Sequence, residues 1–214
     1  MPQIFHPRVN GLTRILLAGG ALAIVAFACV AWFLNRSPYS TGQGAVPEQP
    51  VPFSHQHHVG GLGIDCRYCH TGVDRSRFAG LPDTHTCMSC HSQLWTEAQM
   101  LAPVRESLKE DRPLRWMRVH RLPDFVYFDH RAHVTRGIGC ESCHGRVDRM
   151  PLMSQAAPMT MQWCLDCHRN PQKALRAPDR ITAMGAPAAS DPNALLRRYR
   201  IHTDRMTECV TCHR

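Results

Sequence analysis

The hydrophobic positions of the chain are concentrated near its start. Residues 15–34, ILLAGGALAIVAFACVAWFL, form twenty positions without a charged side chain. This length is sufficient for a helix to cross the hydrocarbon layer of a bilayer. Arg8 and Arg14 precede the stretch, as is typical when the amino terminus stays in the cytoplasm. The pattern therefore predicts a cytoplasmic segment over 1–11, a single-pass anchor over 12–34, and a remainder in the periplasm or on the outer face of the cytoplasmic membrane.

Two other interpretations of this apolar stretch are less well supported. A cleaved signal peptide usually has seven to fifteen apolar residues and a small-residue cleavage site, and the stretch is longer and has no clear A-x-A site beyond it. Residues 26–29, AFAC, faintly resemble a lipidation box, but the chain stays apolar through Leu34. We therefore favour a retained anchor, in which Cys29 is expected to be a small buried residue.

The remainder of the chain has little material for an ordinary core. Residues 35–52 are rich in Pro, Gly and Ser and predict an extended linker. Only 7% of all residues are aromatic, and there are 16 prolines and 14 glycines. We expect mostly coil, very short strands if any, and short helices. The best longer helix candidate is residues 95–109, which Pro103 should kink or split.

Ten of the eleven cysteines lie in five copies of the motif C-x-x-C-H. In chain order, motifs 1 to 5 are Cys66/Cys69/His70, Cys87/Cys90/His91, Cys140/Cys143/His144, Cys164/Cys167/His168 and Cys209/Cys212/His213. In this motif the two thiols form thioethers with a haem, and the adjacent histidine is the proximal iron ligand. The repetition predicts five haems c, around which the residues of 53–214 would fold.

Other uses of the cysteines explain the pattern less well. A disulfide framework gives no reason for a histidine after every second cysteine, and five pairs do not divide evenly among four-ligand zinc sites. The formal charge of +8 could indicate a nucleic-acid partner. However, the propionates of five haems would add about ten negative charges, which ferric centres would only partly offset. The basic excess is then largely internal compensation, and we expect no nucleic acid.

A second pattern divides the haem region into repeats. FSHQHHVGGLGIDCRYCH at 53–70 and FDHRAHVTRGIGCESCH at 128–144 share F-x-H-x-x-H, a glycine-containing spacer and a haem motif. Each copy is followed by Val-Asp-Arg and then by another haem motif. The sequence therefore predicts two two-haem modules, 53–91 and 128–168, joined by 92–127, with a fifth haem at 209–213.

Nine histidines remain as candidates for the opposite, distal face of each haem. In F-x-H-x-x-H the two histidines are three residues apart and share one side of a helical turn, so that each could serve a different haem. This selects the following distal ligands: His55, His58, His130 and His133. We choose His120 as the fifth, because it leads directly into the second module. His57 is expected to contact solvent or a propionate, and His6 precedes the anchor.

Several rival ligands stay open. His85 lies two residues before Cys87, so it is poorly placed for its own haem but could reach a neighbour, and His202 could serve the last haem. A methionine ligand would raise the potential of its haem relative to two histidines. The candidates near motif 4 are Met153, Met159 and Met161, for which core packing is the alternative.

The modules resemble those of the small class III multihaem cytochromes, in which such a histidine pair serves two haems. Across nearly the whole chain the resemblance is closer to the pentahaem cytochrome subunit of alternative complex III. It rests on MPQIFHP, the apolar helix, VHRLPDFVYFDHRAH, MQWCLDCHRNP and the terminal C-x-x-C-H-Arg. Residues 171–200 carry no recognisable chemistry and could form a surface arm against a partner subunit.

The resemblance implies a place in a membrane complex that oxidises quinol. Electrons would arrive through an iron–sulfur subunit, with polytopic quinol-binding subunits in the same complex, and leave for a monohaem cytochrome or a terminal oxidase. The chain itself would be an electron carrier with no catalytic residues of its own. The alternatives are a free-standing membrane-anchored quinol dehydrogenase cytochrome feeding a periplasmic reductase, a multihaem reductase with an open iron, and an electron store.

Overall fold

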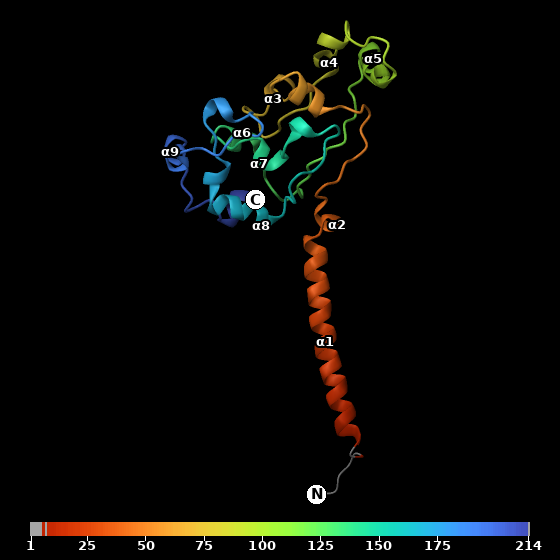
Figure 1. Cartoon of the computed structure of the whole chain (residues 1–214), viewed down its shortest axis with the longest axis vertical. Coiled ribbons are helices and arrows are strands. Elements are labelled where there is room, and N and C mark those ends of the chain that lie inside the picture. Colours follow the sequence, from red (N-terminus) through yellow and green to blue (C-terminus); the bar gives the residue numbers. More distant parts are fainter. Residues whose placement is uncertain (1–5, 7, 214) are drawn as a thin grey trace. The chain divides into compact units, whose positions relative to one another are not determined.

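The computed structural model describes residue 6 and residues 8–213, and the chain divides into two units, residues 1–42 and 43–214. The first unit contains the long helix α1 (Arg8–Arg36) and the short α2 (Pro38–Thr41) (Figure 1). Helix α1 begins four residues before the predicted anchor, and it is long and apolar enough to cross a membrane. It ends where Ser37 and Ser40 donate hydroxyl hydrogen bonds to the carbonyl of Leu34 (2.7 and 2.6 Å) and Pro38 follows.

Two details of this region differ from the expectations. The predicted linker is not extended throughout, because it contains α2, and Val51 at its end is buried within the second unit. Cys29 is exposed on α1, so the expectation of a buried residue is wrong for this chain by itself. The physical reason is that Cys29 lies on a helix none of whose described side chains is buried in the chain.

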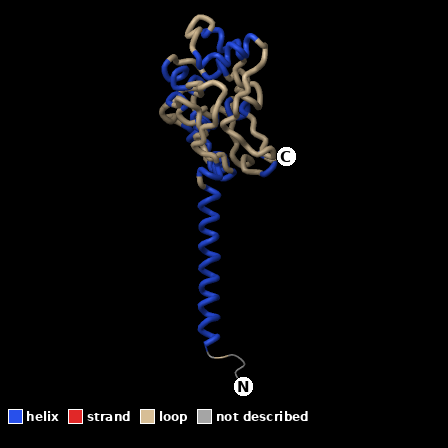
Figure 2. The backbone as a smooth tube through the Cα atoms, turned by 90° about the vertical axis from the view of Figure 1, so that its right-hand side faces the viewer, coloured by secondary structure: helices blue, strands red, loops and turns tan. Residues whose placement is uncertain are grey.

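The second unit consists of short helices joined by long loops, and Figure 2 shows no strand among its described residues. Its helices are α3 (Cys66–Cys69), α4 (Thr84–His91), α5 (Ala102–Lys109), α6 (His130–Val134), α7 (Glu141–His144), α8 (Met161–Arg169), α9 (Pro192–Arg198) and α10 (Cys209–Cys212). Shorter turns are the π-helical η1 (Gln56–Gly61) and the 3-10 helices η2 (Gln99–Leu101), η3 (Val147–Arg149), η4 (Pro171–Ala174) and η5 (Pro178–Arg180). Among the described residues, the β-structure is one isolated bridge between Ile138 and Leu175.

The local sequence explains where several of these helices begin. Asp65, Asp83 and Asp129 lie just before α3, α4 and α6, and each accepts a hydrogen bond from a backbone N–H of the first turn. This is the capping role for which aspartate is favoured. The helix candidate 95–109 is split here, because the 3-10 helix η2 ends at Leu101 and α5 begins at Ala102, one residue before Pro103. The proline therefore occupies the first turn, where its missing N–H costs nothing.

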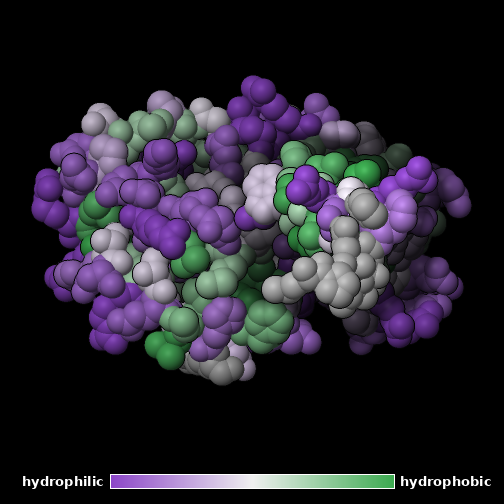
Figure 3. Space-filling view, turned by 90° about the horizontal axis from the view of Figure 1, so that it is seen from below, coloured by the Kyte–Doolittle hydropathy of each residue, from purple (hydrophilic) through white to green (hydrophobic). Residues whose placement is uncertain are grey.

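The apolar core of the second unit is small. One cluster consists of Val51, Leu101 and Val104, and another of Val73, Val134 and Ile181. Hydrophobic and hydrophilic residues are interspersed on the face that Figure 3 shows. Tyr68 and Phe78 are about half exposed or more (51% and 58%), so large side chains near the haem motifs have few protein neighbours. A chain with so little buried apolar surface needs a further source of stabilisation.

The two sequence repeats pack against each other reciprocally. In the first copy, the backbone N–H of Gln56 donates to the carbonyl of Met150, which follows Val-Asp-Arg of the second copy (3.0 Å). At the equivalent position of the second copy, the N–H of Arg131 donates to the carbonyl of Ser76, which follows Val-Asp-Arg of the first (3.2 Å). Each histidine segment thus lies on the other module, which joins the two modules into one body.

Candidate haem sites

All five C-x-x-C-H motifs lie on short helices or at their ends. Helices α3, α4, α7, α8 and α10 carry motifs 1 to 5 in that order. Every cysteine lies in the described part of the chain, and none of them forms a disulfide there. Within the described residues, no group of three or more His, Cys, Asp or Glu side chains is close enough to hold a metal ion.

Four of the five motif histidines are oriented by a backbone carbonyl. Their Nδ1 atoms lie within hydrogen-bond distance of carbonyl oxygens, in the pairs His70–Gly80 (2.8 Å), His91–Leu94 (3.1 Å), His168–Met206 (2.8 Å) and His213–Phe125 (3.1 Å). A carbonyl can only accept, so Nδ1 carries the proton and Nε2 keeps its lone pair. This arrangement fixes the tautomer and the ring orientation of metal-binding histidines.

The F-x-H-x-x-H segments have the same geometry in both modules. In the first, the ring of Phe53 stacks on His58 (centroids 4.4 Å apart, 26° between planes) and meets His55 edge-on (4.9 Å, 87°). In the second, Phe128 stacks on His133 (4.5 Å, 29°) and meets His130 edge-on (4.7 Å, 88°). The phenylalanine therefore holds both histidine rings. Sequence reasoning missed this role, although the residue stands at the same place in both repeats.

The last histidine of each segment is also fixed by its own turn. Nδ1 of His58 lies 2.9 Å from the carbonyl of Ser54, and Nδ1 of His133 lies 2.8 Å from that of Asp129. These carbonyls belong to the residue four positions earlier, so each hydrogen bond closes within the segment. As with the motif histidines, Nδ1 donates and Nε2 keeps a lone pair with which it could bind a metal ion.

Three pairs of histidine rings face each other across similar distances. The centroids are 6.2 Å apart for His58 and His91, 6.1 Å for His133 and His168, and 6.3 Å for His130 and His144. Two imidazoles bound to one metal ion need about 2 Å for each bond and about 1 Å from each nitrogen to its ring centre, or about 6 Å in all. The donor sets at motifs 2, 3 and 4 therefore fit haem with two histidine ligands.

A central group of histidines surrounds motifs 1 and 3. Burial, followed by the charges of neighbouring histidines, lowers the pKa of His55 to about 4 and that of His144 to about 3. Burial also lowers the pKa of His120. Nδ1 of His55 and Nε2 of His120 are buried without a hydrogen-bond partner. Such atoms are costly unless a ligand engages them, and neutral imidazole is the form that binds metal.

His120 is placed differently from the other predicted distal ligands. Its ring centroid lies 4.4 Å from that of His144, with 75° between the planes. This is shorter than the separation of the three facing pairs. Among the described residues, the ring contact found for His213 is with Phe125 (5.8 Å) rather than with a second histidine. The fold thus brings His120 to the central group around motif 3.

The rival ligands lie on the surface or outside these pairs. His57 is exposed and packs near the ring of Trp95 (5.8 Å), as expected for a residue that contacts solvent. His202 is exposed, and Met161 is 64% exposed on α8. Met153 and Met159 are partly buried ahead of α8.

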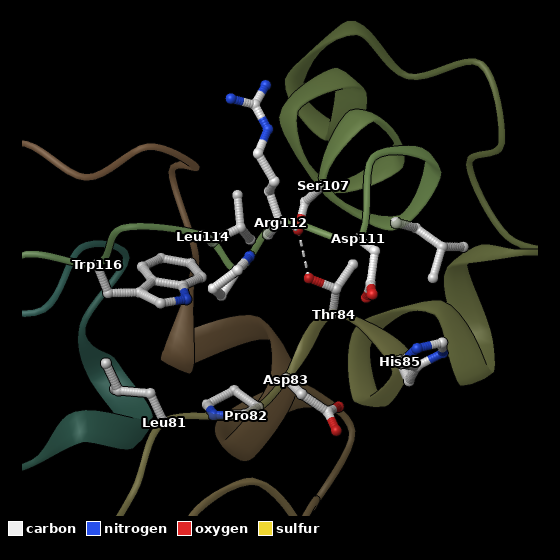
Figure 4. Close-up of a pocket in the computed structure, with 12 residues that line it drawn as sticks. Leu81, Pro82, Asp83, Thr84, His85, Ser107, Asp111, Arg112, Leu114 and Trp116 are labelled. Atoms are coloured by element: carbon white, nitrogen blue, oxygen red, sulfur yellow. Dashed lines mark hydrogen bonds between the residues drawn. The ribbon is translucent and has the colours of Figure 1, made fainter.

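His85 projects from α4 at the rim of a surface pocket that residues of α4, α5 and the following loop line (Figure 4). The hydroxyls of Thr84 and Ser107 meet in this pocket at 2.6 Å. His85 is exposed there. The pocket therefore lies between α4 and α5, and His85 belongs to its lining rather than to any of the three facing histidine pairs.

Comparisons with known proteins identify the family of the chain. A family model described as "Cytochrome c7 and related cytochrome c" matches residues 126–214. The chain is also similar to a protein of Nitratidesulfovibrio vulgaris strain Hildenborough named "Menaquinone reductase, multiheme cytochrome c subunit". The two are 30% identical over 167 residues, which are 78% of this chain and 68% of that protein.

Proposed function

This chain belongs to the multihaem c-type cytochromes, which transfer electrons, and we propose that it is the membrane-anchored, five-haem subunit of a quinol-oxidising complex of the alternative complex III type. The observation that carries the electron-transfer part is the set of three facing histidine pairs at about 6 Å, each containing one motif histidine. The five motifs support the number of haems.

The proposed residue roles follow from the donor atoms. The ten motif cysteines would attach haem, and His70, His91, His144, His168 and His213 would be the proximal ligands. For the distal ligands we propose His55, His58, His130 and His133, with His120 as the fifth. Haem, when bound, supplies a one-electron centre whose potential depends on its axial ligands, its burial and its hydrogen bonds. The backbone carbonyls at Nδ1 increase the basicity of the ligating rings and hold them in place.

The membrane and complex assignment rests on three observations together. Helix α1 is apolar enough to span a bilayer, and none of its described residues is buried in the chain. The curated relative is named as one subunit of a quinone enzyme. The sequence resembles the pentahaem subunit of alternative complex III in its terminal and central motifs. We propose α1 as the anchor and residues 53–214 as the haem domain outside the cytoplasm.

The proposed partners are an iron–sulfur subunit and polytopic quinol-binding subunits. A monohaem cytochrome or a terminal oxidase would be the final acceptor. A second candidate function is a part in menaquinone reduction, which is favoured by the name of the relative, a menaquinone reductase subunit. A third is a free-standing quinol dehydrogenase cytochrome feeding a periplasmic reductase.

Haem staining of a native gel of gently solubilised membranes separates the complex from the free-standing cytochrome. We expect a large band that contains this chain together with iron–sulfur and polytopic subunits, identified by mass spectrometry. A small band with this chain alone would contradict the complex and favour the free-standing cytochrome. Reduction of the purified band by menaquinol, with haem absorbance as the readout, would support quinol oxidation. If the haems stay oxidised with menaquinol, and instead transfer electrons from an added reduced cytochrome to menaquinone, the result would support menaquinone reduction as the function.

A further inference from the structure

We propose that the five haem sites form one unbranched row in the order motif 2, motif 1, motif 3, motif 4, motif 5, with electrons entering and leaving at motifs 2 and 5. This order differs from the order along the chain, because motif 1 lies inside the row and motif 2 at its end. The inference rests on the proposed five-haem loading, but it does not depend on which complex the chain joins. Each site would accept one electron from one neighbour and pass one to the next, with no bond or proton changed.

The link between motifs 2 and 1 is a direct contact of their helices. The hydroxyl of Tyr68, on α3 within motif 1, lies 3.0 Å from the hydroxyl of Ser89, on α4 within motif 2. The adjacent histidine segment leads to the same two sites, since His58 faces His91 of motif 2. The carbonyl of His58 also accepts a hydrogen bond from the backbone N–H of Ile64, two residues before motif 1 (3.0 Å). One segment thus reaches both sites.

Motif 1 is joined next to motif 3, at the contact between the two modules. Asp65, which caps α3, accepts a hydrogen bond from the hydroxyl of Thr182 (2.7 Å). The neighbouring carbonyl of Ile181 accepts from the backbone N–H of Cys140, the first cysteine of motif 3 (3.0 Å). The neighbouring thiol of Cys140 also raises the pKa of Cys66. The first cysteines of motifs 1 and 3 are therefore immediate neighbours, although 74 positions separate them in the chain.

The second histidine segment joins motifs 3 and 4 in the same way that the first joins motifs 1 and 2. His130 faces His144 of motif 3 with ring planes 8° apart, and His133 faces His168 of motif 4. Both lie on the five-residue helix α6.

The last link joins motifs 4 and 5. Nδ1 of His168 bonds the carbonyl of Met206, three residues before motif 5 (2.8 Å). Burial, and then the thiol of Cys212, raise the pKa of Cys164. The ribbon shows the same succession of helices within the second unit, from α4 through α3 and α7 to α8 (Figure 1).

The two ends of the row are also its most accessible sites. Of the ten motif cysteines, Cys90 of motif 2 and Cys209 of motif 5 are exposed, and the other eight are partly buried. A redox partner that approaches the protein surface would therefore meet these sites first. Motifs 1 and 3, at the contact between the modules, are shielded on both sides by neighbouring sites and serve as the central relay.

Magnetic relaxation can test the order without an activity assay. In the full-length, haem-loaded chain, His58→Ala would make the motif 2 haem high-spin and give it a separate electron paramagnetic resonance signal. Nearby paramagnetic haems shorten the relaxation time of this signal. We expect removal of the motif 1 haem by Cys66→Ala with Cys69→Ala to lengthen this time several-fold. Removal of the motif 3 haem, by alanine at both cysteines of that motif, should leave the relaxation time of the motif 2 haem nearly unchanged.

An equal effect of both removals would overturn the proposed order, because it would place motif 2 between motifs 1 and 3. If a removal variant fails to fold, the iron positions in the unmodified haem-loaded chain decide the matter, by cryo-electron microscopy or anomalous X-ray scattering. The iron of motif 1 must then lie between those of motifs 2 and 3. A chain isolated without the proposed complex partners can still show this order, so the two proposals fail separately.

Discussion

Replacing His58 by alanine tests the proposed distal ligands most directly. The His58 ring stands 6.2 Å from that of His91, the separation that a shared metal ion requires. Alanine removes the only imidazole that this geometry offers on that side of His91 among the described ring contacts. We expect one haem in five to change from low to high spin, while all five stay attached through their cysteines.

The variant should still fold. The His58 ring stacks on Phe53 and its Nδ1 donates to the carbonyl of Ser54 at 2.9 Å. Each contact is worth about 1 kcal/mol, so that the loss is about 2 kcal/mol. This is a minor part of the 5–15 kcal/mol that is typical of a folded domain. A change of spin state would therefore report a lost ligand rather than an unfolded chain.

The assay combines electron paramagnetic resonance with a haem count from the pyridine haemochrome spectrum. His57→Ala is the matched control, because the adjacent His57 is exposed and its removal should change stability by less than about 0.5 kcal/mol. Added imidazole should restore the low-spin signal of the His58→Ala variant. A fully low-spin spectrum of this variant, or a high-spin signal of equal size in the control, would refute the assignment.

Three further predictions concern the second module, the contact between the modules and the anchor. His133→Ala should make one haem in five high-spin in the electron paramagnetic resonance spectrum. The double variant with His58→Ala should have two high-spin haems. A double variant with only one high-spin haem would contradict the proposal that the two segments serve separate haems. Gly60→Ala would place a methyl group in overlap with the carbonyl of Asp148. This overlap should lower the free energy of unfolding by about 1–3 kcal/mol. Circular dichroism would show it as a decrease in Tm of about 2–4 °C for each kcal/mol. Gly61→Ala, whose added carbon meets an ordinary contact at 3.8 Å, should change Tm much less, and equal shifts would contradict the packing of η1 on η3. Replacing residues 1–36 by a cleavable export signal should release the haem-stained chain from the membrane pellet, and retention without other subunits would contradict the anchor role of α1.

The positions of the helices illustrate how far local sequence determines structure here. The aspartates before α3, α4 and α6 cap those helices, and such a cap needs only residues within one turn. Pro103 shows the limit of the same reasoning. The proline ring disfavours a helix interior but favours a helix start. Where the helix begins depended on the packing of Val104 of α5 against Leu101 and Val51.

The sequence by itself determined the donor chemistry of this protein. The five C-x-x-C-H motifs, the repeated F-x-H-x-x-H segments and the apolar stretch are local patterns, because a thioether pair, a histidine turn and a membrane span each need only neighbouring residues. These patterns predicted a multihaem cytochrome with mostly coil and short helices, which the family comparison confirmed in its coarse form.

Only the tertiary structure decided which sites are neighbours. The contact of Cys66 with Cys140 and the reciprocal hydrogen bonds of Gln56 and Arg131 join residues more than fifty positions apart. The sequence alone also could not place His120, which the fold brings next to His144. Such contacts depend on how two modules with little apolar surface of their own pack together. The pattern of residues within either module does not predict that packing.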